Sequence, residues 1–166
     1  MTPLPPTYVF DDDTLAFIQG PGAIEAGSRN ARNLPSISFA YGSRVAPERP
    51  AVTVLLSKTS STQVLDDVRE HGVIAVVYSR PTTHQTIQLK GFDARIDAPC
   101  AADAFTHEQY VRGFVDELSK CGYSAAFANA VARQHVQDLV AVTFTPRAAF
   151  NQTPGPRAGQ RLGYPP

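Results

Sequence analysis

The chain has 166 residues, a length that fits one domain built around one hydrophobic core. Hydrophobic residues make up 43% of it, which is enough for a packed interior and excludes general disorder. The formal net charge is +0 and no run of Lys or Arg occurs, so nothing in the composition indicates a nucleic-acid or membrane-surface partner.

The start of the sequence and its cysteines favour a cytoplasmic protein. Residues 1–13 lack the basic start and apolar run of a signal peptide, and no apolar segment approaches the length of a membrane span. Cys100 and Cys121 form no CxxC pair. A chain of this size needs no disulfide, so we expect both to be free thiols.

Hydrophobic periodicity and turn residues predict a mixed chain in which strands come first and helices are inserted late. In chain order we expect a helix at 11–19, strands at 23–28, 36–45 and 52–56, a helix at 61–71, strands at 73–79 and 85–96, helices at 106–121 and 124–136, and a last strand at 139–144. Residues 1–10 form an extended segment, residues 11–150 the domain, and residues 151–166 a Gly/Pro-rich tail without periodicity.

Capping residues define the predicted helices. Asp11, Asp12 and Asp13 offer cap oxygens and negative charge to the first helix. Ser60 or Ser61 caps the second, which Gly72 ends. The run 106–109 (Thr-His-Glu-Gln) reads as a capping box. Its helix has an apolar face, and in the helix that follows, Phe127 and Val131 are expected on the inner side. The apolar face is made by Tyr110, Val111, Phe114, Val115 and Leu118.

The strands differ in their side-chain patterns. Residues 73–79 are nearly all apolar and β-branched, so both faces of that strand are expected to be covered. Residues 85–96 alternate, and Gly91 suits a bulge within one long strand. Short links between strands favour antiparallel pairing, because parallel pairing needs long crossovers. We therefore expect a mainly β (α+β) fold with a closed or nearly closed antiparallel barrel.

The run Ser57-Lys58-Thr59-Ser60-Ser61-Thr62 is the strongest candidate for a binding site. A helix start leaves backbone N–H groups unpaired and carries the positive end of the helix dipole. Hydroxyls add donors and Lys58 adds a full charge, so an anion such as a phosphate fits. An ordinary N-cap beside a solvated lysine fits the same residues.

A second candidate is the polar face of the strand at 85–96, formed by Thr86, Gln88 and Lys90. Amide and hydroxyl groups on a rigid strand suit recognition of the edge of a flat heterocycle. A solvent-facing side of an ordinary strand explains the same pattern.

Other motifs are weaker. Residues 122–126 form a partial GxSxG, but a helix precedes it and Ala126 replaces the last glycine, so we expect Ser124 to be a helix cap rather than a nucleophile. The four histidines have no metal-ligand spacing, and we predict no metal site. His84, beside the polar strand face, is the only histidine retained as a ligand candidate.

The order of these pieces resembles the pyridoxamine 5′-phosphate oxidase-related, FMN-binding split-barrel proteins. The matching stretches are 35–38, 54–57, 60–62, 73–79, 86–91 and 150–156. The resemblance implies a six-stranded antiparallel split β-barrel of Greek-key type with peripheral helices. It also implies a homodimer with FMN in the cleft between the two chains.

The resemblance also assigns candidate cofactor-binding residues. Ser57 and Lys58 end the strand that lines the flavin, the hydroxyls of Ser60, Ser61 and Thr62 meet its phosphate, and Thr59, between them, is also a cofactor-binding candidate. Thr86 and Gln88 come from the strand beside the ring. The tail at 150–157, with Gln152, reaches the flavin of the partner chain.

Two departures from the family pattern bear on the substrate. The oxidase has an Arg-x-Val-Leu-Leu-Lys strand where residues 38–43 stand here, and only the neighbouring Arg44 could replace one of its basic groups. The oxidase ends in Arg-Leu-His where residues 161–163 read Arg-Leu-Gly. We therefore expect an FMN-dependent oxidoreductase that does not use pyridoxamine phosphate. The alternatives are a flavin-binding or storage protein without a substrate, and a haem-binding or haem-degrading relative with His84 as ligand. No catalytic acid or base is identified.

Overall fold

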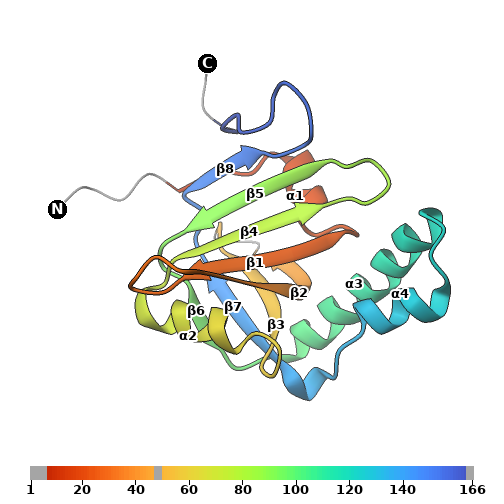
Figure 1. Ribbon diagram of the computed structural model, residues 1–166, viewed down its shortest axis with the longest axis horizontal. Helices are drawn as coiled ribbons and strands as arrows, with labels where there is room; N and C mark the ends of the chain where they lie inside the picture. The colour runs from red at the N-terminus through yellow and green to blue at the C-terminus, as the bar shows by residue number, and fades with distance from the viewer. Residues whose placement is uncertain (1–6, 47–49, 164–166) are drawn as a thin grey trace.

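The computed structural model describes residues 7–46 and 50–163, which form an antiparallel sheet with helices packed around it (Figure 1). The elements in chain order are α1 (Asp12–Ile18), β1 (Ala23–Arg29), β2 (Pro35–Val45), β3 (Val52–Ser57), α2 (Thr62–His71), β4 (Ile74–Ser79), β5 (Thr86–Gly91), β6 (Arg95–Asp97), α3 (Ala101–Lys120), α4 (Ala125–Ala132), a 3₁₀ turn (Val136–Asp138), β7 (Leu139–Phe144) and β8 (Ala148–Asn151).

The sheet is rolled into a barrel. Its strand order is β6-β7-β3-β2-β1-β4-β5-β8, so β5 and β6 are six strand spacings apart, or about 29 Å in a flat sheet. Only residues 92–94 connect them, and four extended Cα steps span at most about 14 Å. The link from β7 to β8, also three residues long, has the same span to cover. Both connections are possible only because the sheet curves back on itself.

Gly91 lies at the point where the barrel closes. A Cβ added there would be 2.6 Å from Phe144 Cδ2 and 3.0 Å from the carbonyl oxygen of Thr145. The end of β5 therefore touches the end of β7, although four other strands lie between them along the sheet. Glycine is needed here because no side chain fits between the two strands.

The interior of the barrel is apolar. Leu55, Leu56, Leu89 and Phe144 are fully buried, and the burial pattern shows that β3 and β7 are covered on both faces. α3 lies along β2, where His107 Nδ1 is 2.8 Å from the carbonyl oxygen of Tyr41, and α4 packs on α3. α2 packs on β1 and β2.

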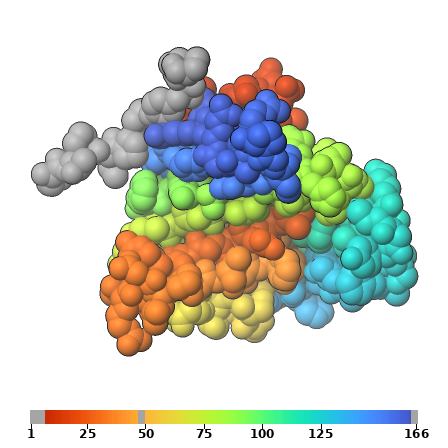
Figure 2. All heavy atoms as spheres, turned by 45° about the horizontal axis from the view of Figure 1, so that its top comes forward, coloured from red at the N-terminus to blue at the C-terminus, as the bar shows by residue number. Residues whose placement is uncertain are grey.

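The C-terminal segment folds back on β8. The backbone N–H of Leu162 donates to the carbonyl of Ala149 (2.8 Å), and that of Asn151 to the carbonyl of Gln160 (2.8 Å). In Figure 2 this segment, in blue, covers the edge of the sheet beside β5. It is therefore attached to the barrel by main-chain hydrogen bonds.

Most predicted helices and strands are confirmed within one or two residues, and the α+β antiparallel class is confirmed. Asp11 caps α1 by accepting from Thr14 N (2.7 Å), and Ser124 caps α4 by accepting from Phe127 N (3.2 Å). Gly72 ends α2 in the left-handed region with φ 67°. The buried positions Tyr110, Val111, Phe114 and Leu118 form the predicted inner face of α3.

Three predictions about the strands are wrong. The sheet has eight strands rather than six, and β8 follows the strand predicted to be last. The segment 85–96 is two strands, β5 and β6, because the chain leaves the sheet at Gly91 and re-enters it at the opposite edge. In β4 buried and half-buried residues alternate, so one face of that strand is only partly covered by the described residues.

Three predictions about helices are also wrong. α3 begins at Ala101, not at 106, because Cys100 and Asp103 form the capping box and Thr106 lies inside the helix. Phe127 is half-exposed, and α4 instead buries the small residues Ala128 and Ala132 against its neighbours. α4 also ends at Ala132, four residues before the predicted end.

Candidate functional site

Residues 57–59, the first half of the predicted anion site, are hydrogen-bonded to the 3₁₀ turn that precedes β7. Ser57 Oγ and Thr59 Oγ1 both donate to the carboxylate of Asp138, the latter at 3.0 Å. Thr59 N donates to the same carboxylate (3.2 Å). Lys58 Nζ donates to the carbonyl of Gln137 (2.6 Å). These donors are therefore already hydrogen-bonded to acceptors of the same chain.

The environment of Asp138 stabilises its ionised form. The hydrogen bond from Ser57 is the main cause that lowers the pKa of Asp138 below its usual value, and the bonds from Thr59 and the charge of Lys58 act in the same direction. The loop 57–59 and the turn at 136–138 are therefore joined by an ionic and hydrogen-bonded contact at the carboxyl end of β3.

The second half of the predicted site, 60–62, leaves a helix start open. Ser61 is the N-cap residue of α2, yet its side chain makes no cap hydrogen bond. No described residue accepts from the backbone N–H groups of residues 62, 63 and 64. The hydroxyl of Ser61 instead lies 2.6 Å from that of Ser38 on β2. Three main-chain donors and several hydroxyls thus converge at the positive end of a helix dipole.

A shallow hollow lies beside Ser38. Its volume is about 160 Å³, and its lining consists of Ser38, Glu25, Ile37 and Phe39. Ile37 and Phe39 are 72% and 53% exposed. The hollow therefore offers two exposed apolar side chains on the outer face of β2, with one carboxylate, that of Glu25, at its side, whereas the hydroxyl of Ser38 points to the other face, towards Ser61.

The polar strand face lies on the outside of the barrel. Strand pairing puts Gln88 in one row with Val77, Glu25 and Phe39, and with Phe150 on β8. No described residue hydrogen-bonds to the amide of Gln88.

Thr86 and Lys90, on the same face, already have partners. Thr86 Oγ1 is bonded to Ser79 Oγ (2.9 Å) and to the carbonyl of His84 (3.0 Å). Lys90 Nζ lies 5.0 Å from the centre of the Phe150 ring. Gln88 is thus the residue of this face with a side chain available to a ligand.

The remaining candidates occupy separate places. Arg44 pairs with Asp103 at 2.8 Å. His84 is an exposed turn residue with φ 58°. The N–H of Gln152 donates to the carbonyl of Thr86 (2.8 Å), which places it at the outer edge of the sheet. One chain therefore does not gather all ten predicted residues.

The two principal parts of the predicted site are also apart in one chain. The start of α2 follows β3, whereas Gln88 is on β5, and β2, β1 and β4 lie between these strands in the sheet. In Figure 1 the turn before α2 lies below the sheet and β5 lies near its top. Within one chain the two parts therefore belong to strands that are not neighbours in the sheet.

Two features of the site were missed in the sequence. Neither Asp138 nor the side chain of Ser38 is marked as a site residue by any motif in the sequence. Asp138 lies 81 residues from Ser57 and Ser38 lies 23 residues from Ser61. The spacing of residues along the sequence does not predict contacts between positions so far apart, because these contacts arise from the pairing of β3 with β7 and of β2 with β3.

Comparison of the sequence finds no matching family model and no matching curated protein. Solved structures do match the fold. HupZ of Group A Streptococcus aligns with TM-score 0.55 and 14% identity, over 91% of this chain and 100% of that one. A Lactobacillus delbrueckii protein named after pyridoxamine 5′-phosphate oxidase aligns with TM-score 0.52 and 8% identity, over 85% and 93%.

An F420 reductase aligns with TM-score 0.51 and 11% identity, over 85% of this chain and 98% of that one. Such identities establish the architecture alone. No helix in the described ranges is both long and apolar enough to cross a membrane. The rolled antiparallel sheet and these alignments show that the chain has the pyridoxamine 5′-phosphate oxidase-like split-barrel fold that its sequence resembles.

Proposed function

We propose that this protein is a homodimeric FMN-binding oxidoreductase whose substrate is not pyridoxamine phosphate. The observation that carries the proposal is the open start of α2, where three backbone N–H groups lack partners and the hydroxyls of Ser60, Ser61 and Thr62 gather. A phosphate monoester is the ligand that best satisfies such a set of donors.

Residues 60–62 of the predicted site can bind the phosphate of FMN, whereas two of the hydroxyls at 57–59 are occupied by another contact. The exposed hydroxyls of Ser60 and Thr62 are free to donate to it from the helix start, and the hydroxyl of Ser61 can donate when that of Ser38 is the donor within their pair. Ser57 and Thr59 are engaged by Asp138, so we assign them the role of holding the loop in position. Lys58 is exposed and donates to the carbonyl oxygen of Gln137, and its charge is shared between Asp138, whose pKa it lowers, and a ligand at the helix start.

The outer face of the sheet supports the dimer. The outward positions of β1, β2 and β4 are mostly apolar or small, apart from Glu25 and Arg29 on β1, and Ile37 and Phe39 are largely exposed in one chain. A second copy on this face covers the apolar rows and brings its own Gln88 towards the first chain. The isoalloxazine ring would then lie on the apolar hollow beside Ser38, with Gln88 of the partner chain at its edge.

Flavin, when bound, supplies hydride or electron transfer. The residues of this chain supply the phosphate donors, an apolar wall of Ile37 and Phe39 and a hydrogen-bonding amide from Gln88. Residues 38–43 lack the two basic residues of the corresponding strand in the oxidase, and Arg44 is paired with Asp103. β2 therefore has no unpaired cation to hold the phosphate of a substrate in addition to that of FMN. This is the physical reason to exclude pyridoxamine phosphate.

The test is FMN binding by the wild-type protein and by the double variant Lys58→Ala, Ser61→Ala. Two charge-assisted contacts are lost, and we expect FMN affinity to fall at least roughly a hundredfold. The exposed pair Ser119→Ala, Lys120→Ala on α3 is the matched control and should bind like wild type. The absence of FMN fluorescence quenching by wild-type protein would refute the proposal. An unchanged affinity in the double variant would move the phosphate elsewhere.

Two further measurements separate the parts of the proposal. Phe39→Asp places a charge on the outer face, and sedimentation should then show monomer, with weakened FMN binding. A dimer that persists in this variant would place the interface on another surface. Steady oxidation of NAD(P)H, or of another electron donor, by the FMN-loaded protein distinguishes an enzyme from a flavin-storage protein.

A further inference from the structure

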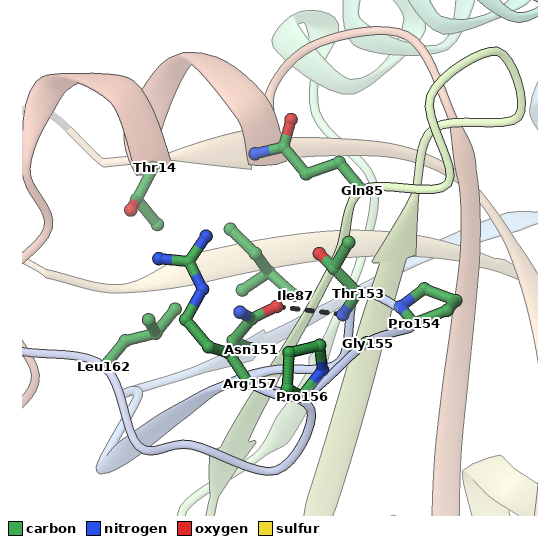
Figure 3. A pocket seen from close by; sticks show the side chains of 10 residues that line it. All are labelled: Thr14, Gln85, Ile87, Asn151, Thr153, Pro154, Gly155, Pro156, Arg157 and Leu162. Carbon is green, nitrogen blue, oxygen red and sulfur yellow. Dashed lines mark hydrogen bonds between the residues drawn. The ribbon is translucent and has the colours of Figure 1, made fainter.

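We propose that the cavity between the C-terminal segment, β5 and α1 is a second binding site, for a small molecule that carries one carboxylate or phosphate group on an apolar body. The cavity has a volume of about 530 Å³ (Figure 3). This lies within the usual range for small-molecule sites, roughly 300–1,000 Å³. Its floor is formed by Ile87 and Leu162, and prolines 154 and 156 form part of its wall.

The cavity is distinct from the surface proposed for the flavin. Ile87 points into the barrel, where it is 6% exposed, and strand pairing sets it opposite Asn151. Gln88, the neighbour of Ile87, points to the outer face. Side chains alternate along a strand, so the cavity and Gln88 lie on opposite faces of β5.

Arg157 supplies the positive charge. Of the described residues that line the cavity, it is the only charged one. Its guanidinium makes no hydrogen bond or ion pair to any residue in the described ranges. In Figure 3 this guanidinium and the amide of Gln85 are turned towards the same space above Ile87.

The loop that carries Arg157 is held in place without a ligand. Ala158 N donates to the carbonyl of Gly155 (3.0 Å), and Gln160 N donates to that of Arg157 (3.1 Å). At the start of the loop, Thr86 N donates to Thr153 Oγ1 (3.0 Å). A site whose loop is already ordered loses less conformational entropy when it binds a ligand.

The side-chain amides of Asn151 and Gln85 also line the cavity and can hydrogen-bond to a ligand. Asn151 Oδ1 accepts from Thr153 N (2.9 Å), which fixes the side chain and leaves its NH₂ group to donate. The amide of Gln85 has no partner among the described residues. A planar guanidinium can donate two parallel hydrogen bonds to two oxygens of a carboxylate or phosphate. The two amides can donate to the remaining oxygens. The apolar body of the ligand would pack on Ile87 and Leu162.

The experiment is calorimetric titration of the protein saturated with FMN, with phenyl phosphate, benzoate, benzamide and inorganic phosphate as probes. We expect phenyl phosphate or benzoate to bind at millimolar concentration or below. Benzamide lacks the charge and inorganic phosphate lacks the apolar body, so both should bind more weakly. In Arg157→Gln, affinity for the anionic aromatic probe should fall roughly tenfold or more.

Matched measurements keep the test specific. Arg112→Gln removes an exposed arginine on α3 and should leave probe binding unchanged. Arg157 is exposed, so Arg157→Gln should keep the wild-type thermal midpoint. The inference is overturned if no anionic aromatic probe binds, if Arg157→Gln binds it like wild type, or if that variant loses FMN affinity, which would place Arg157 in the flavin site. None of these outcomes depends on whether the protein is an enzyme.

Discussion

Replacing Asp138 with asparagine removes the charge that joins the loop at 57–59 to the turn before β7. Three hydrogen bonds converge on the carboxylate, from Ser57 Oγ, Thr59 Oγ1 and Thr59 N. A hydrogen bond to a charged group contributes about 1.5–3 kcal/mol, and one between neutral groups about 1 kcal/mol. Asparagine keeps one acceptor, and solvent screens the charge at this surface position. We therefore expect a loss of about 1–2 kcal/mol in the free energy of unfolding.

The pH dependence of this loss follows from the lowered pKa of Asp138. The ionised carboxylate is favoured in the folded state, so its contribution is fully present above the unfolded pKa, near the model-compound value of 3.8. The contribution is lost as the pH falls through the folded value, which lies below that. The difference in stability between wild type and Asp138→Asn should therefore be constant from neutral pH to about pH 5 and shrink below about pH 4.

Urea denaturation followed by far-UV circular dichroism measures this difference, since the chain contains no tryptophan. At neutral pH the thermal midpoint should drop by about 2–8 °C. Asp116→Asn is the matched control, because Asp116 forms an exposed pair with Lys120 on α3 and its loss should cost less than about 0.5 kcal/mol. Equal stability of Asp138→Asn and wild type, or a difference that persists undiminished at pH 3, would refute the role assigned to this carboxylate.

Two further predictions concern the packing of the barrel. Gly91→Ala forces a methyl group against Phe144 and should cost about 1–3 kcal/mol in urea denaturation; Phe144→Leu in the same chain should recover part of that cost, and strictly additive effects would contradict the clash. Tyr78→Phe leaves the buried hydroxyl of Ser43 without its partner at 3.0 Å and should cost about 1–3 kcal/mol, whereas Tyr123→Phe, at a half-exposed ring, should be neutral. A Tyr78→Phe variant as stable as wild type would show that the hydroxyl pair contributes nothing.

Local signals in the sequence predicted the elements well where a cap or a clear period marked them. Asp11, Ser124 and Gly72 each mark a helix end through their own backbone or side-chain chemistry. Local signals gave a wrong helix start where two neighbouring positions fitted a capping box equally well. Thr106 fits a capping box, but Asp103 forms one that includes Cys100, a residue with little preference for caps.

The long strand predicted across Gly91 shows a different limit. Alternation continues through residues 85–96, so nothing local indicates that the chain changes edges of the sheet there. Gly91 was correctly identified as a special position, but for a bulge. Its actual role, a close approach of β5 to β7, depends on the ring of Phe144, which is 53 residues away in the chain.

The hydroxyl run 57–62 illustrates the same division within the candidate site. Its residue types and their place before an apolar helical stripe follow from the sequence, and they predict donors at a helix start. The contacts of each hydroxyl do not follow from it. Ser57 and Thr59 hold Asp138, whereas Ser61 leaves its helix uncapped and meets Ser38.

Periodicity, caps and glycines in this chain thus establish an antiparallel α+β fold and a cluster of hydrogen-bond donors at a helix start, because these signals act over a few residues. Strand order, the closure of the barrel and the assignment of each donor to its acceptor depend on contacts between residues tens of positions apart. The same contacts create the cavity around Arg157. That arginine lies in a tail without periodicity, and it faces Ile87 only because β8 pairs with β5 and the last residues fold back on β8.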